Sequence, residues 1–486
     1  MLPLLLACLT TAQKATVSSP AQKATVASLA TIDEIVPIPQ VGRPRSYHPP
    51  EATQSTLQSG ASLLLIPKYE LPIVLLSIHL PGGYLSDHDE EWGRADAVAE
   101  MLHKSSGENT TAERSQKLRL LAASIEISVE ENHTTIHISV HKEKLDDTLP
   151  LISDMLFRPS FTIAEWDQLV NYRQEELKQA YEDAGYIANE MQYLLLYPPN
   201  HIRHRLPKGT PKMLQKIDRE SAQQWHIDRL VGSKIGITAT GDINQKVLEQ
   251  VLDKHFPQWP GKKWIAPTVP LQVETASGLF LIDVPGEEQS QLRVLTPAWR
   301  ERDSMDALPA QTANIAMGGS FTSRLNNKMR EQKGYTYGVR SYFQQTDFGN
   351  TFHVRTSVQK ASTAEAIQDL RDILASAQDG FSSEELRKSR STARADIVAF
   401  FETRSDILQA LGTIWRYQRP LNDYHARLTS IEGFNDLSIN QTAKYFSPDR
   451  GIMLVVGDAA EIEPMLSGME YQKCTLENHR LRYEKD

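Results

Sequence analysis

Two apolar segments that end in the same dipeptide constrain the fold of this chain more than any other feature of its sequence. Residues 233–240 and 450–456 have the continuous apolar character of buried strands, and a Gly-Asp pair closes each of them, beginning at Gly241 and Gly457. The two pairs lie 216 residues apart, which is too long a period for a solenoid repeat. The spacing therefore predicts a duplication, with two similar α+β units in one chain.

The rest of the chain repeats the same order of elements on either side of a proline-rich stretch. Shifting the strand pattern of residues 73–80 by 216 places it on another strand pattern at residues 289–296. Helical periodicity predicts three long helices in each unit, at residues 145–156, 163–184 and 187–195 and again at 363–377, 383–401 and 404–415. We therefore expect a leader and flexible tether over residues 1–50, a first domain over 51–260, a linker over 261–275, a second domain over 276–470 and a tail over 471–486.

The composition excludes several classes of protein. The 486 residues contain 52 Lys and Arg against 61 Asp and Glu, which gives a net charge of −9. A protein that binds nucleic-acid phosphates needs a basic surface, so the sequence argues against nucleic acid as a partner. Only two cysteines are present, Cys8 and Cys474, too few for a disulfide framework or a cysteine-ligated zinc module.

The first residues resemble the export signal of a bacterial lipoprotein. The run Leu-Leu-Ala-Cys that ends at Cys8 resembles a lipobox, in which the cysteine is lipidated after cleavage. Residues 12–17 and 21–26 both spell AQKATV, in a segment whose composition suits a flexible tether. We expect a periplasmic protein of a Gram-negative bacterium, anchored at the outer membrane through Cys8 because Leu9 follows the cysteine. Since only seven residues precede Cys8, a fortuitous apolar run stays an alternative.

Three segments resemble the M16 metallopeptidases, the family of insulinase, pitrilysin and mitochondrial processing peptidase. They are the helix that begins at Gly93, the segment LYPPNHIRHRLPKGT at residues 196–210, and GGSFTSRLNNKMREQKGYTYGVRS at residues 318–341. The resemblance covers about residues 55–470. It implies two homologous domains of the LuxS/MPP-like type, each an α+β unit with a mostly antiparallel sheet backed by helices. It also implies two subunits that close around a peptide.

The chain departs from this family at the residues that bind zinc. Active members carry His-x-x-Glu-His on this helix, and the two histidine positions fall on Asp96 and Glu100, with Ala99 at the position of the catalytic glutamate. The family's third ligand falls on Glu176, which alone is retained. Hydrolytic zinc needs imidazole or thiolate ligands and a base for its water, and alanine cannot act as a base. The resemblance therefore implies no metal and no cofactor in this chain.

The acidic side chains at these positions have more than one interpretation. Asp96 and Glu100 lie four residues apart on one helix face, where carboxylates are usually solvated. Glu176 lies beside the packed stripe of its helix, where an inherited carboxylate needs no ligand. The alternative is that the three carboxylates together form an oxygen site for a hard cation.

Two further polar segments are typical of a protein surface. Residues 87–90 spell Asp-His-Asp-Glu, which predicts a charged loop. His133, His137 and His141 recur every four residues in a hairpin region. Because no carboxylate motif accompanies them, we expect three exposed strand histidines.

The second half keeps the residues that M16 enzymes supply from the domain opposite the zinc. Arg330 and Tyr337 lie seven residues apart, as the family's Arg/Tyr pair does. A phenol and a guanidinium can stabilise the oxyanion that forms when a peptide carbonyl is attacked, so the resemblance implies a catalytic role for both, in trans. The alternative is an ordinary salt bridge from Arg330 and a packed Tyr337. The resemblance also implies a substrate-binding surface at Gly318, Gly319, Ser320 and Gly334.

These observations predict the non-zinc subunit of a heterodimeric zinc peptidase. The expected partner is a homologous M16 subunit that carries His-x-x-Glu-His and its zinc, and the expected substrates are peptides that fit an enclosed chamber. Two other hypotheses remain, an inactive scaffold or binding protein of the same fold and a stand-alone peptidase that uses carboxylates on an unusual metal. The Arg330–Tyr337 pair argues against the scaffold, and Ala99 argues against the stand-alone peptidase.

Overall fold

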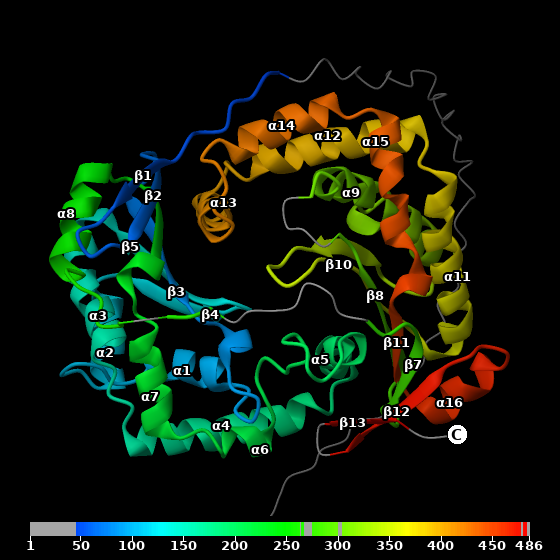
Figure 1. The fold of residues 1–486 in the computed structure, drawn as a ribbon, viewed down its shortest axis with the longest axis horizontal. Helices are drawn as coiled ribbons and strands as arrows, with labels where there is room; N and C mark the ends of the chain where they lie inside the picture. Colours follow the sequence, from blue (N-terminus) through cyan, green and yellow to red (C-terminus); the bar gives the residue numbers. More distant parts are fainter. Residues whose placement is uncertain (1–44, 263, 267–274, 300–303, 478–479, 484–486) are drawn as a thin grey trace, which may run out of the picture. The chain divides into compact units, whose positions relative to one another are not determined.

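The computed structural model describes residues 45–262, 264–266, 275–299, 304–477 and 480–483. Cys8 and nearly all of the expected leader and tether lie outside the described residues, as does most of the expected linker. All the elements described here belong to one compact unit, Tyr47–Asp486, and Figure 1 labels most of them.

The first half of the chain builds a six-stranded sheet in the order β1-β2-β6-β3-β5-β4. Neighbouring strands run antiparallel except for β2 and β6, which are parallel. The strands are β1 (Thr53–Thr56), β2 (Ser62–Pro67), β3 (Ile73–Pro81), β4 (Ser124–Val129), β5 (His133–His141) and β6 (Gly236–Gly241).

The second half builds a seven-stranded sheet in the order β13-β12-β7-β11-β8-β10-β9. The parallel pairs in this sheet are β7 with β11 and β7 with β12. The last two strands continue the sheet into the segment that the sequence analysis assigned to a tail. The strands are β7 (Gly278–Asp283), β8 (Gln289–Pro297), β9 (Arg340–Gln344), β10 (Thr351–Gln359), β11 (Ile452–Gly457), β12 (Gln472–Glu477) and β13 (Arg480–Tyr483).

The strands confirm the predicted duplication. β2 and β7, β3 and β8, β4 and β9, and β6 and β11 each begin 216 residues apart. The strand order β2-β6-β3-β5-β4 of the first sheet corresponds to β7-β11-β8-β10-β9 of the second. The chain therefore has two homologous α+β domains with mostly antiparallel sheets, which is the predicted fold class.

Helices connect the strands in both halves, and several begin at a side-chain N-cap, such as Thr162 before α4 and Thr403 before α13. Within the described ranges, none is long and apolar enough to cross a membrane. The first half has α1 (Arg94–Leu102), α2 (Thr111–Leu120), α3 (Leu145–Phe157), α4 (Ile163–Ala180), α5 (Ala184–Leu196), α6 (Pro211–Leu214), α7 (Arg219–Asp228) and α8 (Gln245–His255). The second half has α9 (Ala307–Asn314), α10 (Arg324–Asn326), α11 (Thr363–Ala375), α12 (Ser383–Ala399), α13 (Arg404–Arg416), α14 (Asp423–Gly433), α15 (Asp436–Asn440) and α16 (Ala459–Ile462).

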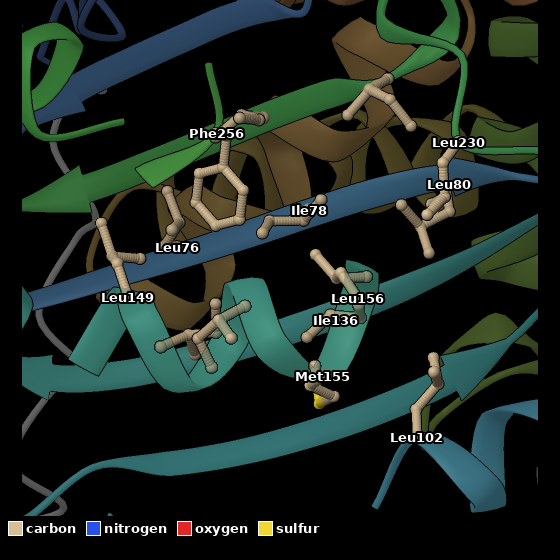
Figure 2. Close-up of a cluster of buried hydrophobic side chains, with 14 of the residues drawn as sticks. Leu76, Ile78, Leu80, Leu102, Ile136, Leu149, Met155, Leu156, Leu230 and Phe256 are labelled. Carbon is tan, nitrogen blue, oxygen red and sulfur yellow. The ribbon is translucent and has the colours of Figure 1, made fainter. Parts of the chain in front are cut away.

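One face of each sheet packs on helices of its own half. In the first half, Ile78 and Ile136 of the sheet share a buried cluster with Leu149 and Met155 of α3 (Figure 2). The corresponding face of the second sheet shares a buried cluster with α11, through residues such as Leu370. These clusters are the two main cores of the molecule, and burial of apolar side chains in them is the main source of stability.

The other face of each sheet is covered by a helix from the opposite half (Figure 1). α13 of the second half packs on β6, β3 and β2 of the first sheet, while α5 of the first half packs on β11 and β8 of the second. α5 and α13 begin 220 residues apart, so they are the same element of the duplicated unit. This exchange explains why β6 and β11 are buried at every position.

Trp415 fixes α13 on the first sheet. Its indole N–H donates to the Ser62 hydroxyl over 2.9 Å, and its ring stacks on His79 with 4.8 Å between the centroids. Gly236 of β6 leaves room for this ring, because a Cβ at that position would lie only 1.9 Å from Trp415 Cε2. The contact therefore requires glycine at residue 236.

We expect Gly236→Ala to lower the free energy of unfolding by about 1–3 kcal/mol, because the added methyl group overpacks the contact with Trp415. The control is Gly433→Ala, since a Cβ at Gly433 meets nothing within 4 Å. Urea denaturation of both variants beside the wild type measures the effect. Equal stability of the two variants would show that α13 is not held in this way.

Candidate functional site

The helix that carries the family's zinc positions is α1, and a buried aspartate fixes where it begins. The Asp87 carboxylate accepts hydrogen bonds from the backbone N–H groups of Gly93 (2.9 Å) and Ala95 (3.0 Å). Burial raises the pKa of Asp87 to about 7, although both hydrogen bonds favour its charged form. Asp87 is 3% exposed. The prediction of a solvated charged loop is therefore wrong at this residue, because its carboxylate caps the helix.

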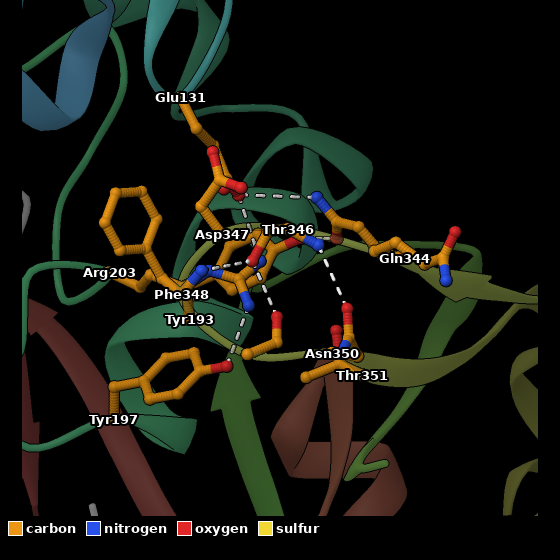
Figure 3. Close-up of polar contacts among 12 residues, drawn as sticks. Glu131, Tyr193, Tyr197, Arg203, Gln344, Thr346, Asp347, Phe348, Asn350 and Thr351 are labelled. Carbon is orange, nitrogen blue, oxygen red and sulfur yellow. Dashed lines mark hydrogen bonds and ion pairs between the residues drawn. The ribbon is translucent and has the colours of Figure 1, made fainter. Parts of the chain in front are cut away.

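The segment at residues 196–210 packs against the same end of α1. Gly93 has a φ of 95°, and a Cβ there would lie 2.5 Å from the carbonyl oxygen of Lys208. Arg203 anchors the segment by donating to Glu131 (3.1 Å) and to the Tyr197 hydroxyl (2.8 Å), as Figure 3 shows. Desolvation opposes the charge of Arg203, but Glu131 and the surrounding tyrosine hydroxyls together outweigh it and raise the pKa of Arg203. These contacts hold Lys208 beside the zinc positions.

The three carboxylates at the family's zinc positions surround an arginine. Asp96 and Glu100 lie on α1 and Glu176 on α4, and α1 packs against α4. The Arg173 guanidinium of α4 lies 2.5 Å from Asp96 Oδ2, 3.3 Å from Glu100 Oε1 and 2.6 Å from Glu176 Oε2. The Lys208 ammonium adds a fourth contact, 3.1 Å from Glu176 Oε1. Two cations thus neutralise most of the charge of three carboxylates.

The pKa shifts in this cluster follow from burial and from these ion pairs. Desolvation raises the pKa of Asp96, and the opposing effect of Arg173 does not cancel it. Desolvation also acts on Glu176, but hydrogen bonds from Arg173 and Lys208 outweigh it and lower its pKa. Arg173 itself is 8% exposed, so its charge depends on these partners.

The cluster does not fit a zinc ion. The guanidinium lies where a cation bound by these carboxylates would lie, and the buried side chain of Ala99 offers no base for a bound water. In the part of the chain that the structure describes, no three His, Cys, Asp or Glu side chains are placed to hold a metal. The hard-cation alternative is therefore wrong for this structure, because Arg173 occupies its ligands. Asp96 and Glu100 are also not simply solvated, because both form ion pairs with Arg173.

Arg330 and Tyr337 lie on the segment after α10. Arg330 belongs to a π-helical turn, Asn327–Gln332, and its guanidinium donates to Glu331 over 2.5 Å while lying 3.5 Å from the centroid of the Phe321 ring. Tyr337 is 97% exposed. Tyr337 is therefore not packed, which contradicts the alternative interpretation for this residue. Arg330 does form the ion pair that the alternative expects, and its partner is the exposed Glu331.

The glycines expected at a substrate surface have packing roles in the described structure. A Cβ at Gly318 would lie 2.3 Å from the Ser341 hydroxyl, and one at Gly319 would lie 2.9 Å from Asn314 Nδ2. Ser320 ends the π-helical turn to which both glycines belong. Gly334 differs, because its surroundings are open and its φ of 66° is what favours glycine.

The histidines of β5 do not form an exposed row. His133 is 5% exposed and lies against Arg416 of α13, and the His137 ring is hydrogen-bonded to the Ser77 hydroxyl at 2.8 Å. Burial lowers the pKa of both rings. The prediction of exposed histidines is wrong because α13 covers this face. The space that remains between the helix and the sheet is an open pocket of about 540 Å³, lined by residues that include His137, Glu126, Glu130 and Arg416.

Comparison with known sequences identifies the family. The profile described as insulinase (peptidase family M16) matches residues 67–192, and the profile described as peptidase M16 inactive domain matches residues 216–392. The chain belongs to the peptidase M16 family. The insulinase profile lies within the first half of the duplication, whereas the inactive-domain profile begins in the first half, before β6, and continues into the second half.

Curated relatives of this M16 protein cover most of both chains at low identity. An uncharacterized zinc protease, YmxG, from Bacillus subtilis is 20% identical over 74% of this chain and 86% of its own length. A protein named non-peptidase homolog YmxG from Helicobacter pylori is 23% identical over 76% of this chain and 85% of its own length. The family thus includes relatives named as proteases and one named as a non-peptidase.

Solved structures share the fold of this M16 protein. A peptidase M16 inactive domain from Pseudomonas fluorescens superposes with a TM-score of 0.77 at 18% identity, over 84% of this chain and 98% of the other. A protease from Helicobacter pylori superposes with a TM-score of 0.72 at 16% identity, over 84% of this chain and all of the other. At these identities the comparison establishes the fold.

Restoring the zinc motif alone is expected not to restore zinc binding. The triple variant Asp96→His, Ala99→Glu, Glu100→His leaves Arg173 paired with Glu176, and its charge repels a divalent cation. Adding Arg173→Gln should give about one zinc per chain, measured by elemental analysis after gel filtration.

The control for this experiment adds Lys178→Gln to the triple variant, because Lys178 lies on the same helix and pairs with Glu175 away from the cluster. We expect this control to stay free of zinc. Stoichiometric zinc in the triple variant with Arg173 intact would contradict the account of the cluster.

Proposed function

We propose that this chain is the non-zinc subunit of a two-subunit M16 peptidase, to which it contributes peptide binding and transition-state stabilisation. The observation that carries the proposal is the contrast between its two halves. The zinc positions of the first half are closed by Arg173, whereas the second half leaves Tyr337 97% exposed on the Arg/Tyr segment. A large aromatic side chain in solvent is available to a ligand or a partner. The relative named as a non-peptidase is consistent with a chain that is not active alone.

In the proposed complex, a homologous M16 chain carries His-x-x-Glu-His and zinc. Tyr337 donates its phenol O–H, and Arg330 its guanidinium, to the oxygen of the scissile peptide bond or to the adjacent backbone. The ion pair of Arg330 with Glu331 lies at the surface, where such pairs contribute little free energy. A substrate carbonyl can therefore replace Glu331 at small cost.

The proposed substrates are unfolded or short peptides taken into a chamber between the two subunits.

We also propose a periplasmic location, with a lipid on Cys8 as the anchor. Membrane fractionation of Cys8→Ser beside the wild type tests the anchor, and identical soluble behaviour of the two proteins would eliminate it.

We expect Arg330→Ala and Tyr337→Phe each to reduce peptidase activity of the reconstituted complex by about 100- to 1000-fold. Both groups act on charge that develops at the scissile carbonyl, so the loss falls mainly on kcat. Asp96→Ala and Glu100→Ala should leave kcat within a few-fold of the wild type if they assemble, because no zinc is bound there. The assay is steady-state cleavage of a quenched fluorescent peptide by the mixed subunits.

Matched substitutions separate chemistry from general effects on the surface. Tyr69→Phe removes the hydroxyl of another exposed tyrosine, and Arg387→Ala removes an exposed arginine on α12. Co-elution of every variant with the partner establishes that assembly is intact. Full kcat for the Arg330 and Tyr337 variants in an intact complex would favour the scaffold hypothesis, and loss of turnover in Glu100→Ala alone would put the active site in the first half.

A further inference from the structure

The second sheet carries a row of three arginines in direct cross-strand register. Arg340 of β9 lies opposite Arg355 of β10, and Arg355 lies opposite Arg293 of β8. Directly opposed residues share a face of the sheet and have Cβ atoms about 5 Å apart. The three positions therefore span only about 10 Å. Like charges placed opposite each other destabilise a sheet, so the row needs a reason other than stability.

The row lies on the sheet face that α5 covers in part. Along β10, Val354 faces the main core of the second half, so Arg355 faces the other way. Arg293 lies at the edge of α5, where its Nε donates to Asn189 Oδ1 over 3.3 Å. Exposure rises along the row: Arg293 is 6% exposed, Arg355 is half-buried, and Arg340 is exposed on β9, the outermost strand. A ligand can reach the row from that edge.

The described residues supply no carboxylate that forms an ion pair with any of the three arginines. Arg293 donates instead to neutral acceptors, among them the carbonyl oxygens of Leu292 (3.0 Å) and Thr356 (3.2 Å). The Nε of Arg355 is buried without a hydrogen-bond partner. Burial, and then the charge of Arg355, lower the pKa of Arg293 to about 10. The charge of Asp183 favours the charged form of Arg293 without forming an ion pair, so within the described part of the chain the positive charges of the row are only partly compensated.

Aromatic rings hold the middle arginine in place. The guanidinium carbon of Arg355 lies 5.2 Å from the centroid of the Tyr342 ring. That ring stacks in turn on the buried ring of His353, at 4.8 Å and an interplanar angle of 6°. A guanidinium fixed in this way loses less conformational freedom when it binds an anion.

We propose that the arginine row binds carboxylate side chains of the peptide, so that this chain selects acidic peptides. The inference rests on the proposed function in peptide binding and names the class of peptide. A guanidinium matches a carboxylate with two parallel hydrogen bonds, and three of them within about 10 Å suit neighbouring Asp or Glu residues.

The test measures binding of labelled peptides to the full chain by fluorescence anisotropy, without a partner subunit. One peptide of about twelve residues carries Glu at alternate positions, and its control carries Gln at the same positions. We expect the Glu peptide to bind at least tenfold more tightly than the Gln peptide. Arg355→Gln should weaken binding of the Glu peptide about tenfold. Arg340→Gln should remove a few-fold, because this side chain is exposed. Arg387→Gln, which removes the same charge from α12, should change the affinity less than twofold.

The outcomes separate this inference from the proposed function. Equal binding of the two peptides, or an acidic preference that survives Arg355→Gln with Arg340→Gln, overturns the acidic selectivity and leaves peptide binding standing. Binding of neither peptide overturns both. Sodium tripolyphosphate is the third probe: if it binds with a dependence on Arg355 while the Glu peptide does not bind, the row is a phosphate site and the inference is wrong.

Discussion

Each sheet of this protein has one face that the opposite half of the chain covers, and most of the molecule depends on that constraint. α13 covers the apolar face of β6, and α5 covers that of β11. Without the exchange, either face would be an apolar patch in water. α5 also leads directly into residues 196–210, so the exchange positions Arg203 beside Glu131 and Lys208 beside Glu176. The two homologous domains therefore form one structural unit rather than two domains on a linker.

An arginine takes the electrostatic role of a metal at the family's zinc positions. A divalent cation would be bound by deprotonated ligands, and here Arg173 is bound by the same three carboxylates. Because removing one member of a partly buried cluster leaves uncompensated charge, the cluster is expected to persist as a unit. The first half thereby keeps the family's fold without the His-x-x-Glu-His residues, while Tyr337 of the second half is exposed to solvent.

The sequence predicted the elements that depend on local pattern and missed the contacts that depend on packing. The duplication and most strands follow from apolar runs and a fixed spacing, so they could be derived. Arg173 could not be placed, because its partners depend on how α1 packs on α4. His133 was predicted at the surface, because Arg416, which covers it, lies 283 residues further along the chain. The arginine row appears only once the register of β8, β10 and β9 is known.

The central proposal is that this chain supplies one wall of the peptide chamber and the Arg330–Tyr337 pair, while a second M16 chain supplies the metal. The most direct test is the zinc content of the complex purified with a homologous His-x-x-Glu-His subunit, followed by separation of the two chains. The account predicts about one zinc for each pair of chains, retained by the partner after separation. Two zinc ions per pair, or zinc that stays with the chain containing Arg173, would contradict it.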